Sequence, residues 1–550
     1  MHTECVYFRL MIASNHKILF FSAWLLLGFW QSINTELLDD EALYWVYSRY
    51  PDWGYFEHPP MVSWLSRAGY AIMPHETGLR LFFLLLNTVS LILLQTLTNR
   101  KDPLLFYGII AGISLFQLSG HLAVPDSPFI FSAICFLIFF QRYLNKSDVV
   151  NGLFLALAIA FAFYSKYHAM LLVGVCFFAN PFLFLRLHTW VVITLTLLLM
   201  MPHFLWLYEN DFGGIMHHLQ ERHRDAWRPS FTLQFLQSQF ISTGPVTGWL
   251  LLFAAFKLRT EKDFDRTLKW LMAGVFLIFL TISFFVRVES NWTVLAFIPM
   301  ILLSHQYLQN HIVLRRFLFL ALPFSLLFIF IHRVSMTSVN GWVNNLSRNE
   351  LHDNNIFASK INEAAAGKPV VFIDSYQQAS KYWFYSGRNS FSLNTINHYR
   401  NSYNLWPGEA SIICKTVCVV DSQDNRKAIL QVIANYYSFS GIYFTVKNIR
   451  RIGNSVEIQC SININKSLLP FIGQQPYMHL PVYLASYDHK GKLSSITPTN
   501  TKIGQLITGH GQLTIHSDQP LSLSAGKFRL AIETAVQNTY TCNSSFFTSR

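Results

Sequence analysis

Long runs of apolar residues, each close to the length needed to cross a lipid bilayer, fill most of the first 335 residues of this 550-residue chain. About 20 consecutive apolar residues are enough for a helix to span the hydrocarbon layer. The runs predict about eleven membrane-spanning helices, at residues 17–34, 79–97, 103–120, 128–143, 150–165, 168–186, 189–207, 235–257, 269–286, 292–308 and 315–335. We therefore expect a mainly α fold in which residues 1–335 form a polytopic membrane helix bundle.

The short connections between these runs alternate in charge. If the N-terminus lies in the cytoplasm, the cytoplasmic connections carry the cations Arg100, Lys101, Arg142, Lys146, Arg186, Lys257, Arg259, Lys262, Arg266, Lys269, Arg315 and Arg316. An excess of Lys and Arg is typical of cytoplasmic loops. The opposite connections, 35–78, 120–127, 208–234 and 287–291, are richer in acidic residues, His and Trp. This pattern predicts a multi-pass inner-membrane protein whose opposite connections and C-terminal tail lie outside the cytoplasm.

The tail changes pattern twice. Residues 336–426 alternate helical and strand signals, with an apolar strand at 370–373 and a helix at 376–385, which predicts an extracytoplasmic α/β domain. Residues 427–550 contain short alternating strands, among them IYFTVKNI, SVEIQCSINI, PVYLASYD and KFRLAIETAV. These strands and the turns between them predict a β-rich domain of the sandwich type.

Composition supports a membrane location. The chain is 52% hydrophobic and only 13% charged, whereas soluble domains carry about 25% charged residues. The net charge of +12 would be compatible with nucleic-acid binding, but no basic stripe interleaved with aromatic residues is present, so no nucleic-acid partner is expected. Seven cysteines form no CxxC pair and no zinc pattern, and the sequence leaves any disulfide pairing in the tail open.

The densest polar signal is the first outer connection, LLDDEALYWVYSRYPDWGYFEHPP. Asp39, Asp40 and Glu41 directly follow a membrane span, and Glu57-His58 precedes a pair of prolines. Adjacent acids can take up a proton or face a cation, and the aromatic residues between them can stack on a sugar or on a prenyl chain. The ordinary alternative is a solvated loop with an aromatic belt at the membrane interface.

Four weaker signals lie in or beside the other outer connections. Asp126 stands between Pro125 and Pro128, where it serves either chemistry or the capping of the following helix. Lys166 ends a span, where it snorkels to the interface or binds a lipid phosphate. The other two signals are the segment GGIMHHLQERHRDAWRP, which is a solvated basic loop or binds phosphate or a metal, and the short loop RVESNW.

None of the common nucleotide-binding motifs is present, neither GxxxxGK[ST] nor GxGxxG after a strand, so no nucleotide cofactor is expected. Nucleotide sugars are cytosolic, and an outward-facing transferase therefore needs another donor. A sugar on a lipid phosphate fits, because it reaches the site through the bilayer.

In these motifs the chain resembles the membrane glycosyltransferases of the GT-C fold, and within them the dolichyl-phosphate-mannose protein mannosyltransferase-like superfamily. It is most similar to the bacterial branch that includes the lipid A aminoarabinose transferases. The segments that carry the resemblance are Asp40-Glu41-Ala42 with Tyr44-Trp45, Asp52–Tyr55, Glu57–Pro60, Pro125–Pro128, Ser165–Tyr167, Asn291-Trp292, DSYQQASKYWFYSG and NLWP. They run from about residue 35 to 407, and the β-rich end lies outside the resemblance.

The resemblance implies roles for individual residues. The main catalytic group would be Asp40, with Glu41 beside it and Asp126 as a second acidic position. Because this chain has DDE at the first motif, Asp39 could share the role. Lys166 and Arg224 would contact the donor phosphate. Glu57 and His218 would hold a divalent metal ion, and His217 and His223 compete with His218 for that match.

The predicted function is the transfer of a sugar, with inversion, from a polyprenyl-phosphate carrier to an envelope glycolipid, glycan or protein on the outer face of the inner membrane. The resemblance to lipid A transferases makes lipopolysaccharide modification one such reaction. The main alternative is a transporter or flippase of lipid-linked sugars, which should place ionisable groups in the middle of spans. Here they cluster at the outer ends. A sensor is disfavoured, because it needs fewer spans and a cytosolic output domain.

Overall fold

The computed structural model describes residues 2–216, 228–337, 349–424, 427–452, 455–488, 491–508, 513–517 and 527–548. The chain separates into two compact units. Unit 1 comprises Met1–Glu209 and His223–His352, and unit 2 comprises Asn210–Arg222 and Asp353–Arg550. The division of the chain at 335 and 426 stays a prediction.

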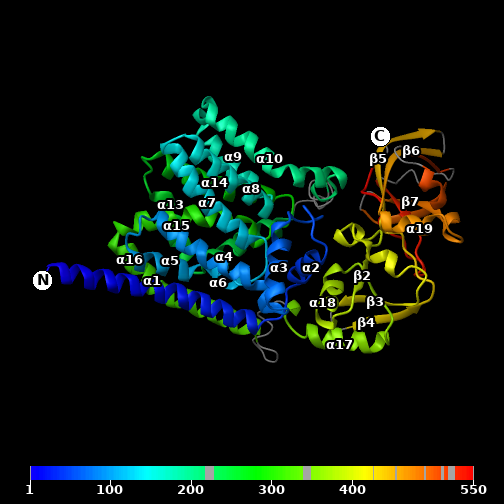
Figure 1. Ribbon diagram of the computed structural model, residues 1–550, viewed down its shortest axis with the longest axis horizontal. Helices are drawn as coiled ribbons and strands as arrows, with labels where there is room; N and C mark the ends of the chain where they lie inside the picture. Colours follow the sequence, from blue (N-terminus) through cyan, green and yellow to red (C-terminus); the bar gives the residue numbers. More distant parts are fainter. Residues whose placement is uncertain are drawn as a thin grey trace. The chain divides into compact units, whose positions relative to one another are not determined.

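Unit 1 is helical (Figure 1). Its described α-helices are α1 (His2–Ile33), α2 (Asp39–Arg49), α3 (Met61–Ile72), α4 (Glu76–Leu97), α5 (Pro103–Gly112), α6 (Ser114–Ser119), α7 (Asp126–Asn145), α8 (Val149–Ser165), α9 (Ala169–Phe178), α10 (Leu187–Glu209), α12 (Pro229–Thr243), α13 (Thr247–Lys257), α14 (Asp263–Ile282), α15 (Val294–Gln309) and α16 (Ile312–Thr337). The predicted spans each coincide with a helix or with two consecutive helices. The first outer connection, expected to be a loop, contains the helices α2 and α3.

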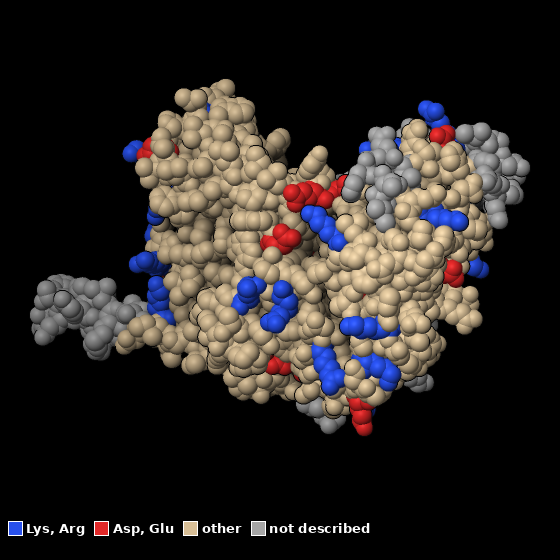
Figure 2. Space-filling view, turned by 45° about the vertical axis from the view of Figure 1, so that its right-hand side comes forward, with Lys and Arg blue, Asp and Glu red and all other residues tan. Residues whose placement is uncertain are grey.

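Four of the described helices, α4, α7, α10 and α16, are individually long and apolar enough to cross a membrane, and the bent pair α12–α13 makes a fifth. Several of these helices present apolar side chains outward: Leu320 of α16 is 72% exposed and Phe324 66%. Figure 2 shows broad surfaces without charged side chains and a row of Lys and Arg along the left-hand margin, with further charged side chains near the centre of the view. Large exposed apolar surfaces of this kind are compatible with lipid rather than with water. The chain is thus a multi-pass membrane protein, and the number of eleven crossings stays a prediction.

Two helix pairs are broken where they meet. The axes of α12 and α13 differ by 93° across the break, and α5 and α6 are separated at Ile113. Gly244 in the first break has φ +109°, and a Cβ there would come within 2.2 Å of the Gly112 carbonyl oxygen in the second. Thr247 donates a hydrogen bond to the same oxygen at 3.3 Å. Only glycine at 244 therefore permits this close approach.

Unit 2 begins with a four-stranded sheet in the order β2-β1-β3-β4. Its strands are β1 (Val370–Ile373), β2 (Ser390–Leu393), β3 (Val417–Asp424) and β4 (Lys427–Ile433), and the helices α17 (Asn354–Ala365) and α18 (Tyr376–Ser386) accompany it. β1 runs parallel to β2 and β3, and β4 pairs antiparallel with β3. The predicted strand at 370–373 and helix at 376–385 are confirmed. The predicted boundary at 426 falls inside the β3–β4 hairpin.

Two antiparallel three-stranded sheets, β10-β7-β8 and β5-β6-β9, complete unit 2. Their strands are β5 (Ile442–Ile452), β6 (Ser455–Ile464), β7 (Pro481–Tyr487), β8 (Leu493–Lys502), β9 (Leu513–Ser517) and β10 (Lys527–Ile532). One hydrophobic cluster takes side chains from both sheets, including Ile458 of β6 and Leu530 of β10. The four predicted strands of this region are confirmed, and the shared core is typical of a sandwich.

Candidate functional site

Helix α2 begins directly with the acidic triplet. Asp39, Asp40 and Glu41 occupy its first turn, where carboxylates interact favourably with the partial positive charge of a helix N-terminus. Asp40 is exposed, whereas Glu41 is completely buried. Successive residues of a helix are rotated by about 100°, so the two neighbouring acids necessarily face different surroundings.

Glu41 lies in a closed network with Arg80 of α4. The Arg80 guanidinium donates to both carboxylate oxygens, at 2.7 and 2.5 Å, and both side chains are fully buried. The same carboxylate accepts hydrogen bonds from the backbone N–H groups of Leu38 at 3.0 Å and Ala123 at 2.7 Å. This network fixes the start of α2 and joins it to the segment that precedes α7.

Arg80 also holds the chain that leads into α2. Its guanidinium donates to the carbonyl oxygens of Ser32, Thr35 and Glu36, at 3.1, 2.7 and 2.9 Å. All of the strong donors of the arginine are thus engaged in positioning this connection. Arg80 was not among the residues singled out from the sequence, where its signal is a single cation near the start of an apolar run.

Asp126, the first residue of α7, lies at the centre of a second cluster. Its carboxylate accepts from the Lys166 ammonium at 2.7 Å and from the Asn291 side-chain amide at 2.8 Å. The aspartate and the lysine are almost completely buried. Helix capping was the alternative interpretation of Asp126, but its oxygens bond instead to groups from two other connections. Among the described residues, Asp126 is the only hydrogen-bond partner of the Lys166 ammonium.

Tyr44 of α2 connects the two clusters. Its phenol is buried, and its pKa is raised well above the ordinary value, first by burial and then by the negative charges of Asp40, Asp126, Glu57 and Glu41. Coulombic effects of this kind decline with distance. Four of the carboxylates singled out from the sequence therefore lie within electrostatic range of one hydroxyl group.

The segment between α2 and α3 supplies Glu57 and His58. The Tyr47 hydroxyl donates a short hydrogen bond to Glu57, and the His58 ring lies edge-on to Tyr44 with centroids 5.4 Å apart. The Tyr47 ring stacks on Tyr55 at 4.0 Å. This stack, together with the hydrogen bonds of the Tyr55 hydroxyl to Ser63 and to the Tyr47 carbonyl, holds the segment against α2 and α3.

The Asp52-Trp53-Gly54 motif docks on α10. The Trp206 indole N–H donates to Asp52 at 2.9 Å, and His203 contacts the Trp53 carbonyl oxygen at 2.7 Å. Gly54 lies against the Trp206 ring so closely that a Cβ would approach it to 2.4 Å. These contacts explain the motif as a means of fixing the Glu57 segment.

His218 and Arg224, the predicted metal and phosphate ligands, lie outside the described residues, as do their neighbours His217 and His223. Within the part of the chain that is described, no group of three His, Cys, Asp or Glu side chains is placed to hold a metal ion. The metal ion and the catalytic roles of Asp40, Glu41 and Asp126 therefore stay predictions. The phosphate contacts of Lys166 and Arg224 also stay predictions.

The arrangement can perform acid–base and charge-stabilising chemistry. It offers an exposed carboxylate on Asp40, a buried carboxylate–ammonium pair, and aromatic rings at the end of a membrane bundle. A lysine in such a position can stabilise a developing negative charge on a substrate.

Comparisons with known proteins find a family that matches part of the chain, relatives in sequence, and solved structures with a similar fold. Residues 57–206 match the family described as dolichyl-phosphate-mannose-protein mannosyltransferase. The lipid A galacturonosyltransferase RgtD of Rhizobium johnstonii is 24% identical over 281 residues, which cover 48% of this chain and 59% of RgtD. The lipopolysaccharide core galacturonosyltransferase RgtA of the same organism is 28% identical over 189 residues, or 31% of this chain and 37% of RgtA. The chain thus spans about three fifths of the first relative and less than two fifths of the second.

The solved structures with a similar fold include ArnT from Cupriavidus metallidurans. The apo form superimposes with a TM-score of 0.56 at 13% identity, covering 75% of this chain and 94% of ArnT. The form bound to undecaprenyl phosphate gives a TM-score of 0.54, with 74% and 93% covered. At this level of identity the likeness shows the GT-C fold and leaves the chemistry to be argued from the site.

Proposed function

Because residues 57–206 match the dolichyl-phosphate-mannose-protein mannosyltransferase family and the chain has the fold of ArnT, we propose that it is a glycosyltransferase that uses a polyprenyl-phosphate sugar. The acceptor is an envelope glycolipid, glycan or protein on the outer face of the inner membrane, and the transfer inverts the anomeric carbon. The names of RgtD and RgtA favour galacturonic acid as the sugar and lipopolysaccharide as the acceptor.

One observation carries the proposal: the negative charges of Asp40, Asp126, Glu57 and Glu41 all act on the Tyr44 phenol, and the Asp126 carboxylate accepts a hydrogen bond from the Lys166 ammonium. A lipid-linked donor brings a phosphate at the membrane interface, and a buried ammonium is a suitable partner for that phosphate. An exposed carboxylate nearby is a suitable partner for the acceptor. Transport alone does not need these two groups at the end of the bundle.

The reaction is a single displacement. The acceptor oxygen forms a bond to the anomeric carbon while the bond from that carbon to the phosphate oxygen breaks, and polyprenyl phosphate leaves with the electron pair. Lys166, which has N–H groups beyond the one bonded to Asp126, donates to the leaving phosphate. Asp40 takes the proton of a hydroxyl acceptor, or orients an acceptor that is already ionised.

A divalent metal ion would neutralise the donor phosphate if it were bound. Glu57 and His218 are the residues that would hold this ion, and His218 lies outside the described residues. Arg224 would add a further contact to the carrier phosphate.

The proposed topology has eleven crossings, with the first connection and unit 2 outside the cytoplasm. His75 is exposed in the first connection. A cysteine-depleted chain carrying His75→Cys should react with a membrane-impermeant maleimide in intact spheroplasts. Labelling that requires permeabilised membranes would place the connection in the cytoplasm and exclude the proposed site.

The activity itself is tested with purified protein in vesicles. Polyprenyl-phosphate galacturonic acid is supplied with lipid A or core lipopolysaccharide, and mass spectrometry of the glycolipid detects an added hexuronic acid. The matched control is Asp263→Asn, because Asp263 is exposed and pairs only with Arg266 at 2.8 Å among the described residues. Wild type and Asp263→Asn should transfer the sugar at equal rates. Turnover of the donor without a glycosylated product, or movement of the intact donor across the bilayer, would contradict the proposal.

A further inference from the structure

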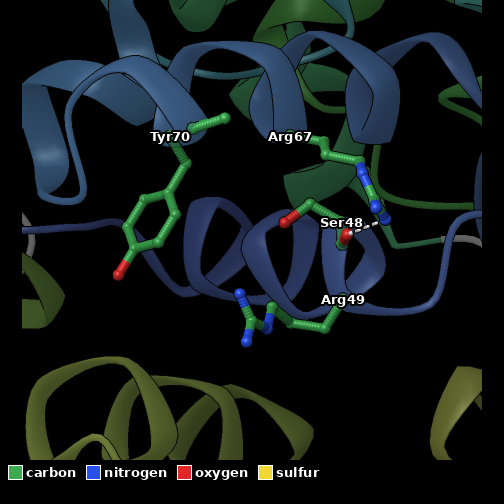
Figure 3. A pocket seen from close by; sticks show the side chains of 5 residues that line it. Ser48, Arg49, Arg67 and Tyr70 are labelled. Carbon is green, nitrogen blue, oxygen red and sulfur yellow. Dashed lines mark hydrogen bonds between the residues drawn. The ribbon is translucent and has the colours of Figure 1, made fainter.

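A pocket of about 360 Å³ lies at the other end of α2, where α2 faces α3 (Figure 3). It is lined by Ser48, Arg49, Arg67, Tyr70 and Ala71. Its volume is near the lower end of the range of about 300–1,000 Å³ found for small-molecule sites. The reaction proposed above uses none of these residues.

Both arginines of the pocket are held by neutral groups. The Arg49 guanidinium lies over the Trp45 ring, 5.6 Å from its centroid, and Trp45 in turn contacts the edge of Tyr70 at 5.7 Å. Arg67 donates to the Ser48 carbonyl oxygen at 3.3 Å. In Figure 3 the Arg49 side chain extends toward the side of Tyr70, and the Arg67 guanidinium lies near Ser48.

The pocket carries positive charge that the described protein does not neutralise. Among the described residues, no carboxylate pairs with Arg49 or Arg67. One role of the two cations is to offset the partial negative charge at the C-terminus of α2. That role needs no concavity, however, and two arginines with a tyrosine in a pocket also provide the planar donors that bind phosphate and carboxylate groups.

The position of the pocket excludes the donor phosphate as its ligand. Arg49 is nine residues beyond Asp40 on one helix, which corresponds to about 13 Å along the axis. The donor phosphate is bonded to the reacting carbon and must lie at the catalytic end of α2. A second anionic group, one sugar or more away from the reacting centre, fits the other end.

We propose that this pocket binds an anionic group of the acceptor glycolipid, a phosphate or a sugar carboxylate, and so selects charged over neutral acceptors. The proposal rests on the function proposed above, and it adds a substrate class to it. Two substrates that approach α2 from its two ends would be aligned by one rigid helix.

The test measures binding, so that it does not depend on turnover. Purified protein in phosphatidylcholine nanodiscs is titrated with lipid A that carries both of its phosphates and with dephosphorylated lipid A. The wild type should bind the phosphorylated form about tenfold more tightly, because charge-assisted hydrogen bonds to arginine are lost with the phosphate. Arg49→Gln/Arg67→Gln should bind both forms equally. Arg388→Gln/Arg450→Gln removes the same charge from exposed positions of unit 2 and should keep the preference.

Any other result of this experiment would overturn either the inference about the pocket or the proposed function. Equal binding of the two lipids by the wild type, or a preference that survives in Arg49→Gln/Arg67→Gln, overturns the inference. Repetition in phosphatidylglycerol nanodiscs tests the membrane as a competing source of phosphate, and loss of the preference there would assign the pocket to phospholipid head groups instead. A wild type that discriminates in binding but transfers no sugar would refute the proposed function alone.

Discussion

Unit 1 contains two buried ion pairs, Glu41–Arg80 and Asp126–Lys166, which have similar distances of 2.5 and 2.7 Å. They differ in the other groups to which they are hydrogen-bonded. The first pair also binds two backbone N–H groups and three backbone carbonyl oxygens. Within the described part of the chain, the second pair has one further hydrogen-bond partner, the side-chain amide of Asn291.

The difference separates a structural pair from a reactive one. A saturated pair has no donor or acceptor left for a substrate, and its backbone partners make it a part of the fold. A pair with few partners retains hydrogen-bonding capacity, and its ammonium can exchange a protein carboxylate for a substrate phosphate. Ion-pair distance alone would not have distinguished the two, because a buried pair is weak evidence of either role.

The largest expected effect follows from breaking the saturated pair. Arg80→Met leaves a buried carboxylate without its cation and should destabilise the fold by about 3–5 kcal/mol. The double change Glu41→Gln/Arg80→Met removes both charges but leaves the Ser32, Thr35 and Glu36 carbonyl oxygens without this donor, at about 1–3 kcal/mol for each buried group. The double variant should therefore unfold nearly as early as the single one in a thermal scan in detergent. Recovery of the wild-type midpoint would contradict the structural role.

The other pair should give the opposite result. Asp126→Asn/Lys166→Met removes both charges and leaves one amide to be satisfied, so we expect a loss of about 1 kcal/mol of stability. Transfer should nevertheless fall by about 100-fold or more, because the cation beside the leaving phosphate is gone. The transfer rate per folded molecule, measured beside the thermal midpoint, checks both parts. Normal transfer, or unfolding as severe as that of Arg80→Met, would contradict the proposed reactive role of the Asp126–Lys166 pair.

The smallest effect is a titration shift that tests whether the carboxylates converge. The charges of Asp40 and Asp126 help to raise the pKa of Tyr44, so Asp40→Asn should lower that pKa, as followed by phenolate absorbance with Tyr44→Phe as the reference. Burial likewise raises the pKa of Tyr55 to about 12. Above pH 10 the unfolded chain loses phenol protons that the folded chain retains, so stability should fall as pH rises through this range. An unchanged titration of Tyr44 in Asp40→Asn would show that the two groups are not close.

Much of the architecture could be predicted from the sequence, because the apolar runs and the alternating strands are local patterns. The helices of unit 1 other than α2 and α3, and the strands β1, β5, β6, β7 and β10, follow directly from them. The two breaks could not be predicted in the same way, since Gly244 and Gly112 are far apart in sequence and meet only in the folded bundle. Helix α2 was missed because its polar and aromatic residues do not show a clear apolar period, and α3 was missed because its 12 residues are too few to cross a membrane.

Individual residues of the site could be predicted from the sequence, but the ion pairs that they form could not. Asp126 and Lys166 were each singled out, although nothing local shows that side chains 40 positions apart form a pair. Asp40 and Glu41 are chemically similar neighbours, and only the rotation of the helix sends one to the surface and the other to Arg80. Arg80 itself is a single cation in an apolar run, and its partners Ser32, Thr35, Glu36 and Glu41 lie about 40 to 50 positions earlier in the chain.

The rate of sugar transfer by Asp40→Asn, measured per folded molecule in reconstituted vesicles, tests the account most directly. Asparagine preserves the shape of the first turn of α2 and removes the exposed charge, so the protein should remain folded. If Asp40 takes the acceptor proton beside the Lys166–Asp126 pair, the rate should fall by about 10²–10⁴-fold. A transfer rate close to that of the wild type would contradict the assignment of the reaction to this end of α2.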